Sequence, residues 1–388
     1  MLPHYRRIGL ITLGGWLSLS PPAAALADQA PTQPPAAAAN PSTWVLDTAA
    51  LGDLDGLIKK LTAVQVVHVG EIHDRFEHHL NQLAIIRGLH AKHPDLVIGM
   101  EFFQQPFQPY LDQYIAGTLS EGEMLRKTEY FSRWSYDYRL YRPILQFARD
   151  RRIPLIALNI PRELTQKVSR QGLAMLTPEE RAQIPGEMDR SDALYRQRLE
   201  QIFAEHPMKE RNSFENFLDA QLLWDEGMAD RAAQHFRAHP NGHMVLLAGA
   251  GHLVHGQGIP SRLARRVAVR SSIVINDSGG RPEPGVADFL LFPQPVETPK
   301  GGTLGVFLEQ DDDNNNVIKG FTEGSPAEAA GLRKGDRLVS LGSASIKSYE
   351  DIRIALLDQQ PGDEVDLEVA RSPLFMGEER VRVRVRLF

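Results

Sequence analysis

Four short apolar runs, each rich in β-branched residues and followed by a helical pattern, constrain the fold of this chain more than any other feature. Within each run apolar and polar residues scarcely alternate, which is typical of strands that are buried on both faces. Buried strands separated by helices predict an α/β fold, in which a parallel sheet is flanked by helices. The runs span residues 64–69, 96–100, 153–158 and 244–248, and a fifth at 272–275 is expected to join them.

The segments between these runs carry apolar residues at helical spacing. Pro143 is expected to mark the true start of one helix, and Thr177 is a suitable N-cap for another. Residues 160–239 form a long insertion with more helix than one crossover requires, so part of it is expected to form a lid or a subdomain. The predicted helices are residues 76–90, 138–149, 178–203 and 214–236.

The N-terminus has the features of an export signal. A basic pair at residues 6–7 precedes an apolar stretch at 8–19 that is too short to span a bilayer. Small residues at positions 25 and 27 then predict cleavage before Asp28. A signal of this kind implies a periplasmic or secreted protein, and the alternative is an uncleaved membrane anchor.

Composition excludes several classes of site and partner. The chain has no cysteine, so disulfides, iron–sulfur clusters, thiolate-held haem and zinc–thiolate sites are ruled out. Its 49 acidic side chains outnumber its 43 basic ones, which argues against nucleic acid as a partner. No stretch after the signal is long and apolar enough to cross a membrane, so no membrane span is expected once the signal is cleaved.

Shifts in composition divide the chain into five expected segments. A stretch of mostly Pro and Ala follows the signal, and a second stretch with three prolines separates two domains. The segments are a signal peptide at 1–27, a Pro/Ala-rich linker at 28–45, an α/β domain at 46–292, a linker at 293–299 and a small, mostly-β domain at 300–388.

The small C-terminal domain has a regular series of turn and capping residues. Two glycines at 301–302 precede a predicted strand at 304–307, and a Gly-rich backbone of this kind can turn several N–H groups toward a peptide carboxylate. Ser325 is a suitable N-cap for a short helix. Ser348 begins a capping box that predicts a second helix, with Ile352 on its apolar face.

These features resemble a bacterial-type PDZ domain. The resemblance rests on Leu-Gly-Val at 304–306, Gly-Ser-Pro-Ala-Glu-Ala-Ala-Gly-Leu at 324–332, Lys-Gly-Asp at 334–336 and the helix capped by Ser348. It implies that a peptide or a protein C-terminus adds as a strand between the first strand and this helix. The alternative is a PDZ-shaped spacer that docks on its own chain. The expected peptide-binding residues are Leu304, Gly305, Val306 and Ile352.

Polar residues stand at the carboxyl ends of four predicted strands. Because these ends lie at one edge of a parallel sheet, where ligands bind, residues far apart in the chain are expected to meet in one crevice. Two carboxylates, two imidazoles and an amide there could form a metal site or an acid–base site. The candidates are Glu71, His73, Glu101, Asn159 and His252.

Each of these residues also has a purely structural explanation. Glu71 and His73 could cap the helix that begins near Asp74. Glu101 could pair with a lysine or an arginine, and His252 could be a buried histidine that is satisfied within the core. The coincidence of polar residues at all four strand ends favours the pocket.

The motifs at the four strand ends resemble those of one known family. They are Gly70-Glu71-Ile72-His73, Met100-Glu101-Phe102, Leu158-Asn159-Ile160-Pro161-Arg162 and Gly249-Ala250-Gly251-His252. Residues 64–274 are similar to the ChaN-like haem-binding uptake proteins, which share a superfamily with Tiki-type proteases and erythromycin esterases. The resemblance implies haem binding in iron acquisition, by a homodimer that sandwiches the haem and holds its iron through a tyrosine.

An aromatic cluster at residues 130–141 favours haem binding independently of this resemblance. Haem is a large flat apolar ring, and the cluster offers stacking surfaces and phenolate ligands. The candidate ligands are Tyr136, Tyr138 and Tyr141, and no motif chooses among them. Packing of the last two on one helix face is the alternative, because they lie one turn apart.

Three hypotheses follow for the function. The first is an exported haem-binding protein whose PDZ domain recruits a peptide or a partner. The second is a metal-dependent hydrolase or protease, in which a divalent ion such as Mn or Zn activates water and the PDZ domain presents peptide tails. The third is a scaffold with a vestigial pocket. In the second, the metal ligands would be Glu71, His73, Glu101 and His252.

Overall fold

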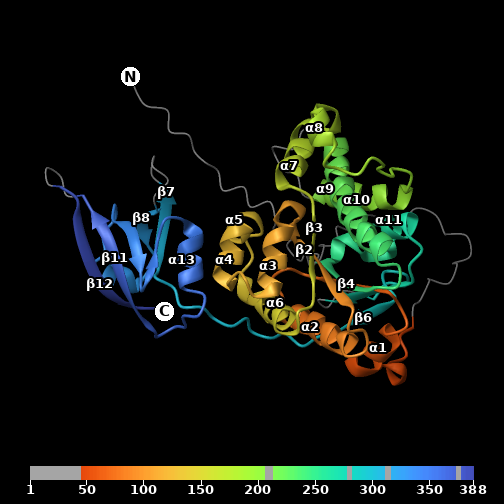
Figure 1. Ribbon diagram of the computed structural model, residues 1–388, viewed down its shortest axis with the longest axis horizontal. Coiled ribbons are helices and arrows are strands. Elements are labelled where there is room, and N and C mark those ends of the chain that lie inside the picture. The colour runs from red at the N-terminus through yellow and green to blue at the C-terminus, as the bar shows by residue number, and fades with distance from the viewer. Residues whose placement is uncertain (1–44, 206–212, 278–281, 311–315, 373–376) are drawn as a thin grey trace, which may run out of the picture.

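The computed structural model describes residues 45–205, 213–277, 282–310, 316–372 and 377–388. The predicted signal peptide and all but the last residue of the linker at 28–45 lie outside these residues. Figure 1 shows a large α/β part joined to a smaller part that consists mainly of strands. Within the described ranges, no helix combines the length and the hydropathy that a membrane crossing requires.

The α/β part contains a six-stranded sheet in the order β3-β2-β4-β1-β5-β6, and every neighbouring pair is parallel. The predicted parallel sheet flanked by helices is therefore confirmed. The short edge strand β6 was not predicted, and its residues are only half-buried. The strands are β1 (Val66–Glu71), β2 (Leu96–Gln104), β3 (Leu155–Asn159), β4 (His243–Gly249), β5 (Ser271–Asn276) and β6 (Phe289–Leu291).

Helices cover both faces of this sheet (Figure 1). The predicted helix at 76–90 agrees with the structure at both ends, and the one at 214–236 continues to Ala238. The helices of the α/β part are α1 (Leu54–Leu61), α2 (Phe76–His90), α3 (Gln108–Ala116), α4 (Glu121–Lys127), α5 (Tyr130–Arg133), α6 (Tyr138–Arg151), α7 (Arg162–Gln171), α8 (Pro178–Arg181), α9 (Ala193–Glu205), α10 (Phe214–Ala238) and α11 (Ile259–Arg266).

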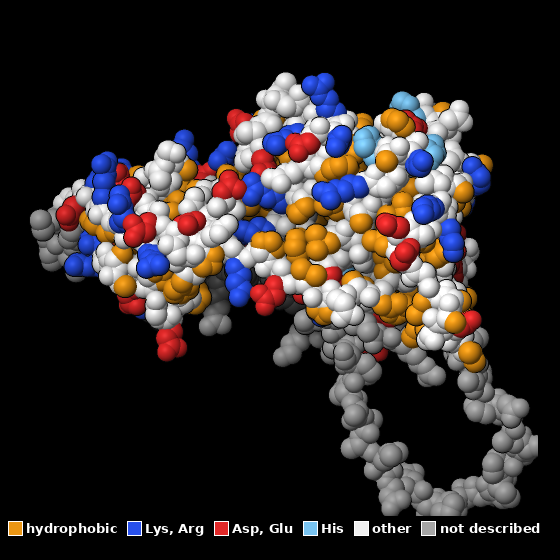
Figure 2. Space-filling model, turned by 90° about the horizontal axis from the view of Figure 1, so that it is seen from below, with side chains coloured by type: hydrophobic (Ala, Val, Ile, Leu, Met, Phe, Trp, Pro, Cys, Tyr) orange, Lys and Arg blue, Asp and Glu red, His pale blue; other side chains and the backbone are white. Residues whose placement is uncertain are grey.

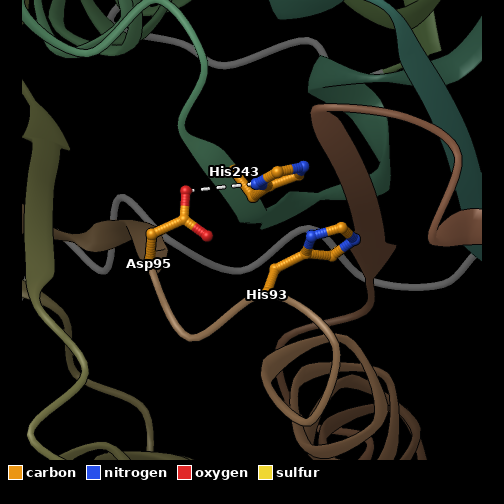
Figure 3. A group of neighbouring side chains, drawn as sticks. All are labelled: His93, Asp95 and His243. Atoms are coloured by element: carbon orange, nitrogen blue, oxygen red, sulfur yellow. Dashed lines mark hydrogen bonds and ion pairs between the residues drawn. The ribbon is translucent and has the colours of Figure 1, made fainter.

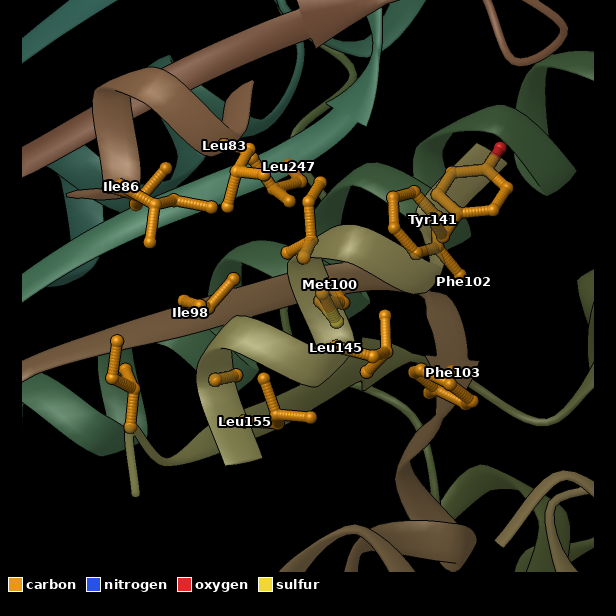
Figure 4. Packing of buried hydrophobic residues seen from close by; sticks show 14 of the residues in the cluster. Leu83, Ile86, Ile98, Met100, Phe102, Phe103, Tyr141, Leu145, Leu155 and Leu247 are labelled. Carbon is orange, nitrogen blue, oxygen red and sulfur yellow. The ribbon is translucent and has the colours of Figure 1, made fainter. Parts of the chain in front are cut away.

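Both faces of the sheet are buried, which explains why its strands are apolar throughout. Along β4, Val245 and Leu247 pack in the core that α2 and α6 cover, as Figure 4 shows for Leu247. Leu246 and Ala248 point the opposite way, into the core that α10 and α11 cover. The carboxyl edge of the sheet is thereby held between two packed layers.

The prediction that Pro143 starts a helix is wrong. Pro143 lies inside α6, which begins at Tyr138. The side chain of Asp137 accepts a hydrogen bond of 2.9 Å from the backbone N–H of Arg139 and so caps the helix. The capping aspartate, rather than the proline, sets where the helix starts.

The insertion at 160–239 also differs from its prediction in one respect. Thr177 caps α8 with a capping box, as expected, but the single helix predicted at 178–203 does not form. Instead α8 ends at Arg181 and α9 begins at Ala193. A Pro-Gly pair at 185–186 lies between them, and both residue types are poor helix formers.

The smaller part contains an antiparallel sheet in the order β12-β11-β9-β8-β7, with β10 paired to β9. The strand predicted at 304–307 begins two residues later, and Leu304 is part of the core of the smaller part. The elements are β7 (Val306–Gln310), β8 (Asn316–Phe321), α12 (Pro326–Ala329), β9 (Arg337–Leu341), β10 (Ala344–Ser345), α13 (Tyr349–Ala355), β11 (Glu364–Arg371) and β12 (Glu379–Arg386).

Charged side chains of both signs are interspersed over the smaller part, as Figure 2 shows for one face. The arginines of β12 face acids on the neighbouring strand β11. Arg382 lies 2.6 Å from Glu368, and Arg384 lies 2.8 Å from Asp366. These cross-strand pairs neutralise what would otherwise be a basic row on an edge strand.

The smaller part docks on the α/β part through α13, which lies against α4 and α5 (Figure 1). Arg126 of α4 lies 2.7 Å from Asp351 of α13. Arg139 of α6 donates a hydrogen bond of 2.8 Å to the backbone carbonyl of Leu356. Leu357 completes the contact, since it is buried in the core of the α/β part.

Candidate functional site

A pocket opens at the carboxyl edge of the parallel sheet, and we call it the strand-end pocket. Its cavity volume is about 110 Å³, which is below the range of about 300–1,000 Å³ usual for cofactor sites. Four predicted residues line it, and the fifth, Glu71, lies directly behind His73. The four are His73, Glu101, Asn159 and His252, and they share the walls with Phe102, Gln104, Arg133, Trp134, Tyr136, Arg162 and Trp224, among others.

Glu71, the last residue of β1, orients His73. Its Oε1 atom lies 2.5 Å from Nδ1 of the imidazole, so the carboxylate fixes one ring nitrogen. The rings of Trp134 and Tyr136 lie 4.8 and 4.9 Å from the His73 ring, measured between centroids. Burial lowers the pKa of His73, but the charges of Glu71 and Glu101 outweigh it, and the pKa is raised above its ordinary value of 6.5.

Glu101 lines the pocket from within β2, which continues to Gln104 and does not end before Glu101 as predicted. One carboxylate oxygen accepts the backbone N–H of Gly249 at 2.7 Å, and the other lies 3.5 Å from Nε2 of His252. Burial raises the pKa of Glu101, but His252 and His73 outweigh it and lower the pKa to about 2. The alternative that Glu101 pairs with a lysine or an arginine is wrong.

Asn159 supports Glu101 from the neighbouring strand. Its amide nitrogen donates a hydrogen bond of 3.2 Å to the backbone carbonyl of Glu101. Its buried side-chain oxygen has no hydrogen-bond partner within the described residues. A buried acceptor of this kind is expected to find a donor, from water or from a bound ligand.

Asp225 is the site residue that sequence reasoning missed. It lies in α10, and its Oδ1 atom is 2.6 Å from Nδ1 of His252. Its other oxygen accepts the hydroxyl of Tyr195 at 2.7 Å. Burial lowers the pKa of His252, but Asp225 and Glu101 outweigh it and raise the pKa to about 10. The sequence signal that could have found it is an acid directly after the apolar run 222–224 of a helix.

The structure also tests whether Glu71 and His73 merely cap the helix α2. The N-cap of α2 is Arg75, and no side chain caps the helix by accepting a hydrogen bond there. Glu71 instead contacts His73, and its second oxygen lies 3.5 Å from Nε2 of His79. The capping alternative is therefore wrong.

The three candidate tyrosines lie in different surroundings. Tyr136 lines the strand-end pocket. Tyr138 is buried and donates its hydroxyl to Glu121 at 3.0 Å. Tyr141 is buried beside Phe102 (Figure 4) and donates to the backbone carbonyl of His73 at 3.1 Å. Burial raises the pKa of Tyr138 and Tyr141 well above 10, which disfavours the phenolate form.

A strained turn presents the two aromatic side chains of this wall. Ser135, between Trp134 and Tyr136, has a φ of 72°, in the left-handed region. A residue other than glycine pays roughly 1–2 kcal/mol for this conformation, and such residues gather at functional sites. The turn places both flanking rings in the pocket wall.

Two arginines add positive charge to the pocket. Arg133 donates to Gln104 and Glu163, at 2.9 Å in both cases. Arg162 donates to the backbone carbonyl of Ser132 at 2.6 Å. Guanidinium groups held in this way can bind carboxylates of a ligand.

Histidine and carboxylate donors do not converge on a common metal position in this pocket. Among the described residues, only one set of His, Asp or Glu side chains has three donor atoms within 4.8 Å of one another. That set is His93, Asp95 and His243, near the start of β2 and β4. It lies at the opposite edge of the sheet from the strand-end pocket.

The expected peptide-binding residues lie around β7 and α13. Leu304 and Ile352 belong to the core of the smaller part, and Gly305 has a φ of 69°, which glycine adopts at little cost. Val306 begins β7, whose only strand partner in the described chain is β8. The outer edge of β7 can therefore accept another strand.

Solved structures resemble each part of the chain. That of ChaN of Campylobacter jejuni, described for its cofacial haem binding, has a TM-score of 0.51 and 17% identity, and covers 62% of this chain and 91% of that one. At this identity the likeness shows the fold alone. The PDZ domain of a carboxy-terminal protease from Vibrio cholerae, solved with a peptide, is 23% identical and covers 22% of this chain and 94% of that one, with a TM-score of 0.18.

A curated relative is much longer than this chain. It is Protein RETICULATA-RELATED 5, chloroplastic, of Arabidopsis thaliana, which is 26% identical over 264 residues. The match covers 60% of this chain and 35% of the relative, so the chain spans about a third of the relative's length.

Family patterns match both parts of the chain. The pattern of the PDZ domain matches residues 317–371. The pattern described as haem-binding uptake, Tiki superfamily, ChaN matches residues 57–263, more than half of the chain. The protein thus belongs to the ChaN family of haem-binding uptake proteins in the Tiki superfamily, and it carries a PDZ domain after its ChaN domain.

Proposed function

We propose that this protein is an exported haem-binding protein of haem or iron acquisition, whose PDZ domain recruits a peptide or a partner. One observation carries the proposal: Tyr136 lines an aromatic pocket that also contains two arginines. Haem combines a flat apolar ring, two carboxylates and an iron that needs a ligand, and this pocket has a group suited to each.

The residues that line the pocket match the parts of haem in their chemistry. Trp134, Phe102 and Trp224 offer surfaces for the ring. Arg133 and Arg162 offer cationic partners for the propionates. Haem itself would supply the iron chemistry, and the chain would supply the orientation and the ligand.

Among the three candidate tyrosines, we propose Tyr136 as the iron ligand. Tyr136 lines the strand-end pocket, whereas Tyr138 and Tyr141 are buried and do not line it. A phenolate at position 136 would also balance the positive charge of the neighbouring arginines.

Titration of the purified protein with ferric haem tests this proposal. We expect a Soret shift that saturates in the wild type and that Tyr136→Phe weakens by about tenfold or more. Tyr138→Phe is the matched control, because it removes a hydroxyl that donates to Glu121, and neither residue lines the pocket. Equal haem affinity in the wild type and Tyr136→Phe would contradict the assignment of the ligand.

The cofacial haem binding of the Campylobacter protein suggests a dimer here as well. We propose that two copies of this chain face each other across the haem, since the strand-end pocket is open on one side. Light scattering then gives a doubling of molar mass when haem is added. An unchanged molar mass at saturating haem would contradict the dimer and would indicate that a single copy binds haem.

One observation favours a second candidate, a metal-dependent hydrolase or protease. Both pocket histidines present Nδ1 to a carboxylate, His73 to Glu71 and His252 to Asp225. This arrangement is usual behind histidines that bind metal through Nε2. Elemental analysis distinguishes the haem protein from the hydrolase. Bound Mn or Zn in the wild type, with loss of both the metal and a peptidase or esterase activity in His73→Gln, would favour the hydrolase.

The role of the PDZ domain is the remaining part of the proposal. A peptide would add beside β7, where the backbone groups of the outer edge are available, and would contact Tyr349 of α13, which is 41% exposed. The docking of α13 on α4 and α5 leaves this strand edge uncovered by other described strands. Binding of a C-terminal peptide library to wild type and to Val306→Pro tests whether the module is more than a spacer.

A further inference from the structure

Two histidines and an aspartate gather at the amino edge of the parallel sheet, on the side away from the strand-end pocket. We call His93, Asp95 and His243 the amino-edge cluster. Figure 3 shows the two imidazole rings one above the other, with one nitrogen of each on the side of the Asp95 carboxylate. Donor atoms of all three side chains lie within 4.8 Å of one another.

From this geometry we propose that the amino-edge cluster is a second binding site, for a divalent transition-metal ion of the Zn²⁺ type. Two imidazoles and a carboxylate are the donors that Zn²⁺ takes in three-ligand protein sites, with a solvent position left open. Such a site goes beyond haem binding and uses none of the residues of the strand-end pocket.

The backbone holds the three side chains in register. His243 is the first residue of β4 and pairs with Leu96, the residue after Asp95, in the neighbouring strand β2. His93 is fixed by hydrogen bonds from its own N–H to Leu89, at 2.8 Å, and from the N–H of Leu96 to its carbonyl, at 3.0 Å. Two of the ligands therefore come from the short turn between α2 and β2, and the third comes from β4.

The hydrogen bond of His93 leaves a nitrogen lone pair available. Nε2 of His93 lies 3.1 Å from the backbone carbonyl of Thr62, so it carries the proton and Nδ1 is left as an acceptor. A histidine that donates its other N–H to a carbonyl is the usual arrangement behind a metal ligand. Nδ1 of His243 donates its N–H to Asp95 at 3.2 Å, and a metal ion that bridges the two residues would displace this proton.

The cluster is open enough for an ion to enter and remain hydrated. The Asp95 side chain is 54% exposed and that of His243 is 21% exposed. The two rings stack with centroids 3.6 Å apart and an angle of 18° between their planes, so at least one ring must tilt out of the stack before both Nδ1 lone pairs reach one ion. A bound water would complete four-coordination.

Another imidazole lies close to this edge. Asp95 shares the wall of an adjoining surface hollow with His235 and His239, from the end of α10. Nε2 of His235 is buried and has no hydrogen-bond partner in the described part of the chain. Burial, with the nearby His239 and Arg231, lowers the pKa of His235 to about 4, so its ring is neutral and keeps a lone pair. This concentration of neutral donors favours metal binding at the edge.

Titration of the chelator-treated full chain with Zn²⁺ tests the proposal by calorimetry. We expect a saturable site whose affinity falls about tenfold or more in Asp95→Asn and in His243→Gln. His255→Gln is the matched control, because His255 is exposed and lies outside both sites. His73→Gln, in the strand-end pocket, is expected to keep the edge site intact, so a loss of haem binding and a loss of Zn²⁺ binding are separable.

Imidazole nitrogen chemical shifts provide a readout that a change in folding would not imitate. Zn²⁺ is expected to move the Nδ1 resonance of His93 and to leave that of His73 in place. Circular dichroism confirms that each variant is folded before its affinity is compared. Zn²⁺ affinity that is unchanged in Asp95→Asn and His243→Gln, or the absence of saturable binding to the wild type, overturns the proposal.

Discussion

At the scale of single residues, a glycine sets how closely the two halves of the strand-end pocket approach. A Cβ atom on Gly249 would lie 2.9 Å from Cε1 and 3.2 Å from Nε2 of His73. Both atoms belong to a ring that Glu71 and the aromatic wall already hold. Position 249 therefore needs glycine because β1 and β4 pack closely there. It does not need glycine for an unusual backbone conformation.

Gly249→Ala is predicted to displace His73 and to lower the free energy of unfolding by about 1–3 kcal/mol, the usual cost of overpacking. Urea denaturation measures the change. Gly251→Ala is the matched control: a Cβ there meets nothing within 4 Å, so we expect a change within about 0.5 kcal/mol. Equal stability of the two variants would contradict the close contact.

The pH dependence of stability also belongs to single residues. The folded pKa of His252 is about 10, above its ordinary value of 6.5, so its protonated form stabilises the fold. This contribution is fully present below about pH 6.5 and is lost as the pH rises through the folded pKa. Glu101 behaves in the opposite way, because its pKa is lowered to about 2, and its contribution is lost only in strong acid.

Asp225→Asn is predicted to reduce the loss of stability that His252 causes as the pH rises. It is also predicted to lower the free energy of unfolding by roughly 3–5 kcal/mol, the usual cost of breaking a buried ion pair. Unfolding free energies between pH 6.5 and 10 measure both effects. Asp74→Asn serves as the control, because the side chain of Asp74 is 68% exposed. If the unfolding free energy of Asp225→Asn falls with rising pH as much as that of the wild type, a group other than His252 causes the fall.

At the scale of elements, the sequence predicts what local chemistry decides and misses what tertiary contacts decide. The apolar runs predict β1 to β5, because a strand that is buried on both faces is a continuous apolar run in the sequence. The helical spacing predicts the start of α6 at Tyr138 correctly. The expectation that Pro143 marks the start is wrong, since the capping bond of Asp137 outweighs the preference of Pro143 for a first turn. Strand β6 is missed because it is short and only half-buried.

The same distinction explains what was foreseen of the site. Residues at strand ends could be predicted to meet, because a parallel sheet brings all its carboxyl ends to one edge. Asp225 could not, since it reaches the pocket from the middle of a helix whose position on the sheet depends on packing. The choice of Tyr136 over Tyr138 and Tyr141 likewise depends on which side of a turn faces the pocket.

The contact between α4 and α13 yields a prediction at this scale. A Cβ on Gly122 would lie 2.8 Å from Cγ2 of Ile354, so the helices touch at a glycine. Gly122→Phe is expected to separate the PDZ domain from the ChaN domain while both stay folded. Small-angle scattering measures the larger radius of gyration, and Gly52→Phe, at an open position, is the control. An unchanged radius in Gly122→Phe would contradict the docking.

At the scale of the whole molecule, export is a prediction from the first residues alone. The signal at 1–27 is expected to be removed on export, with Asp28 as the new N-terminus. Expression of the full chain in a bacterium, followed by N-terminal sequencing from the periplasmic fraction, checks this. Retention of the complete N-terminus in a membrane fraction would favour the uncleaved anchor.

The central claim for the whole molecule is that the ligand lies at one edge of the parallel sheet. Ferric haem broadens nearby imidazole resonances, and the two edges carry different histidines. We predict that haem broadens the ring signals of His73 and His252 and leaves those of His93 and His243 sharp. Sharp signals from His73 and His252 at saturating haem would contradict the account.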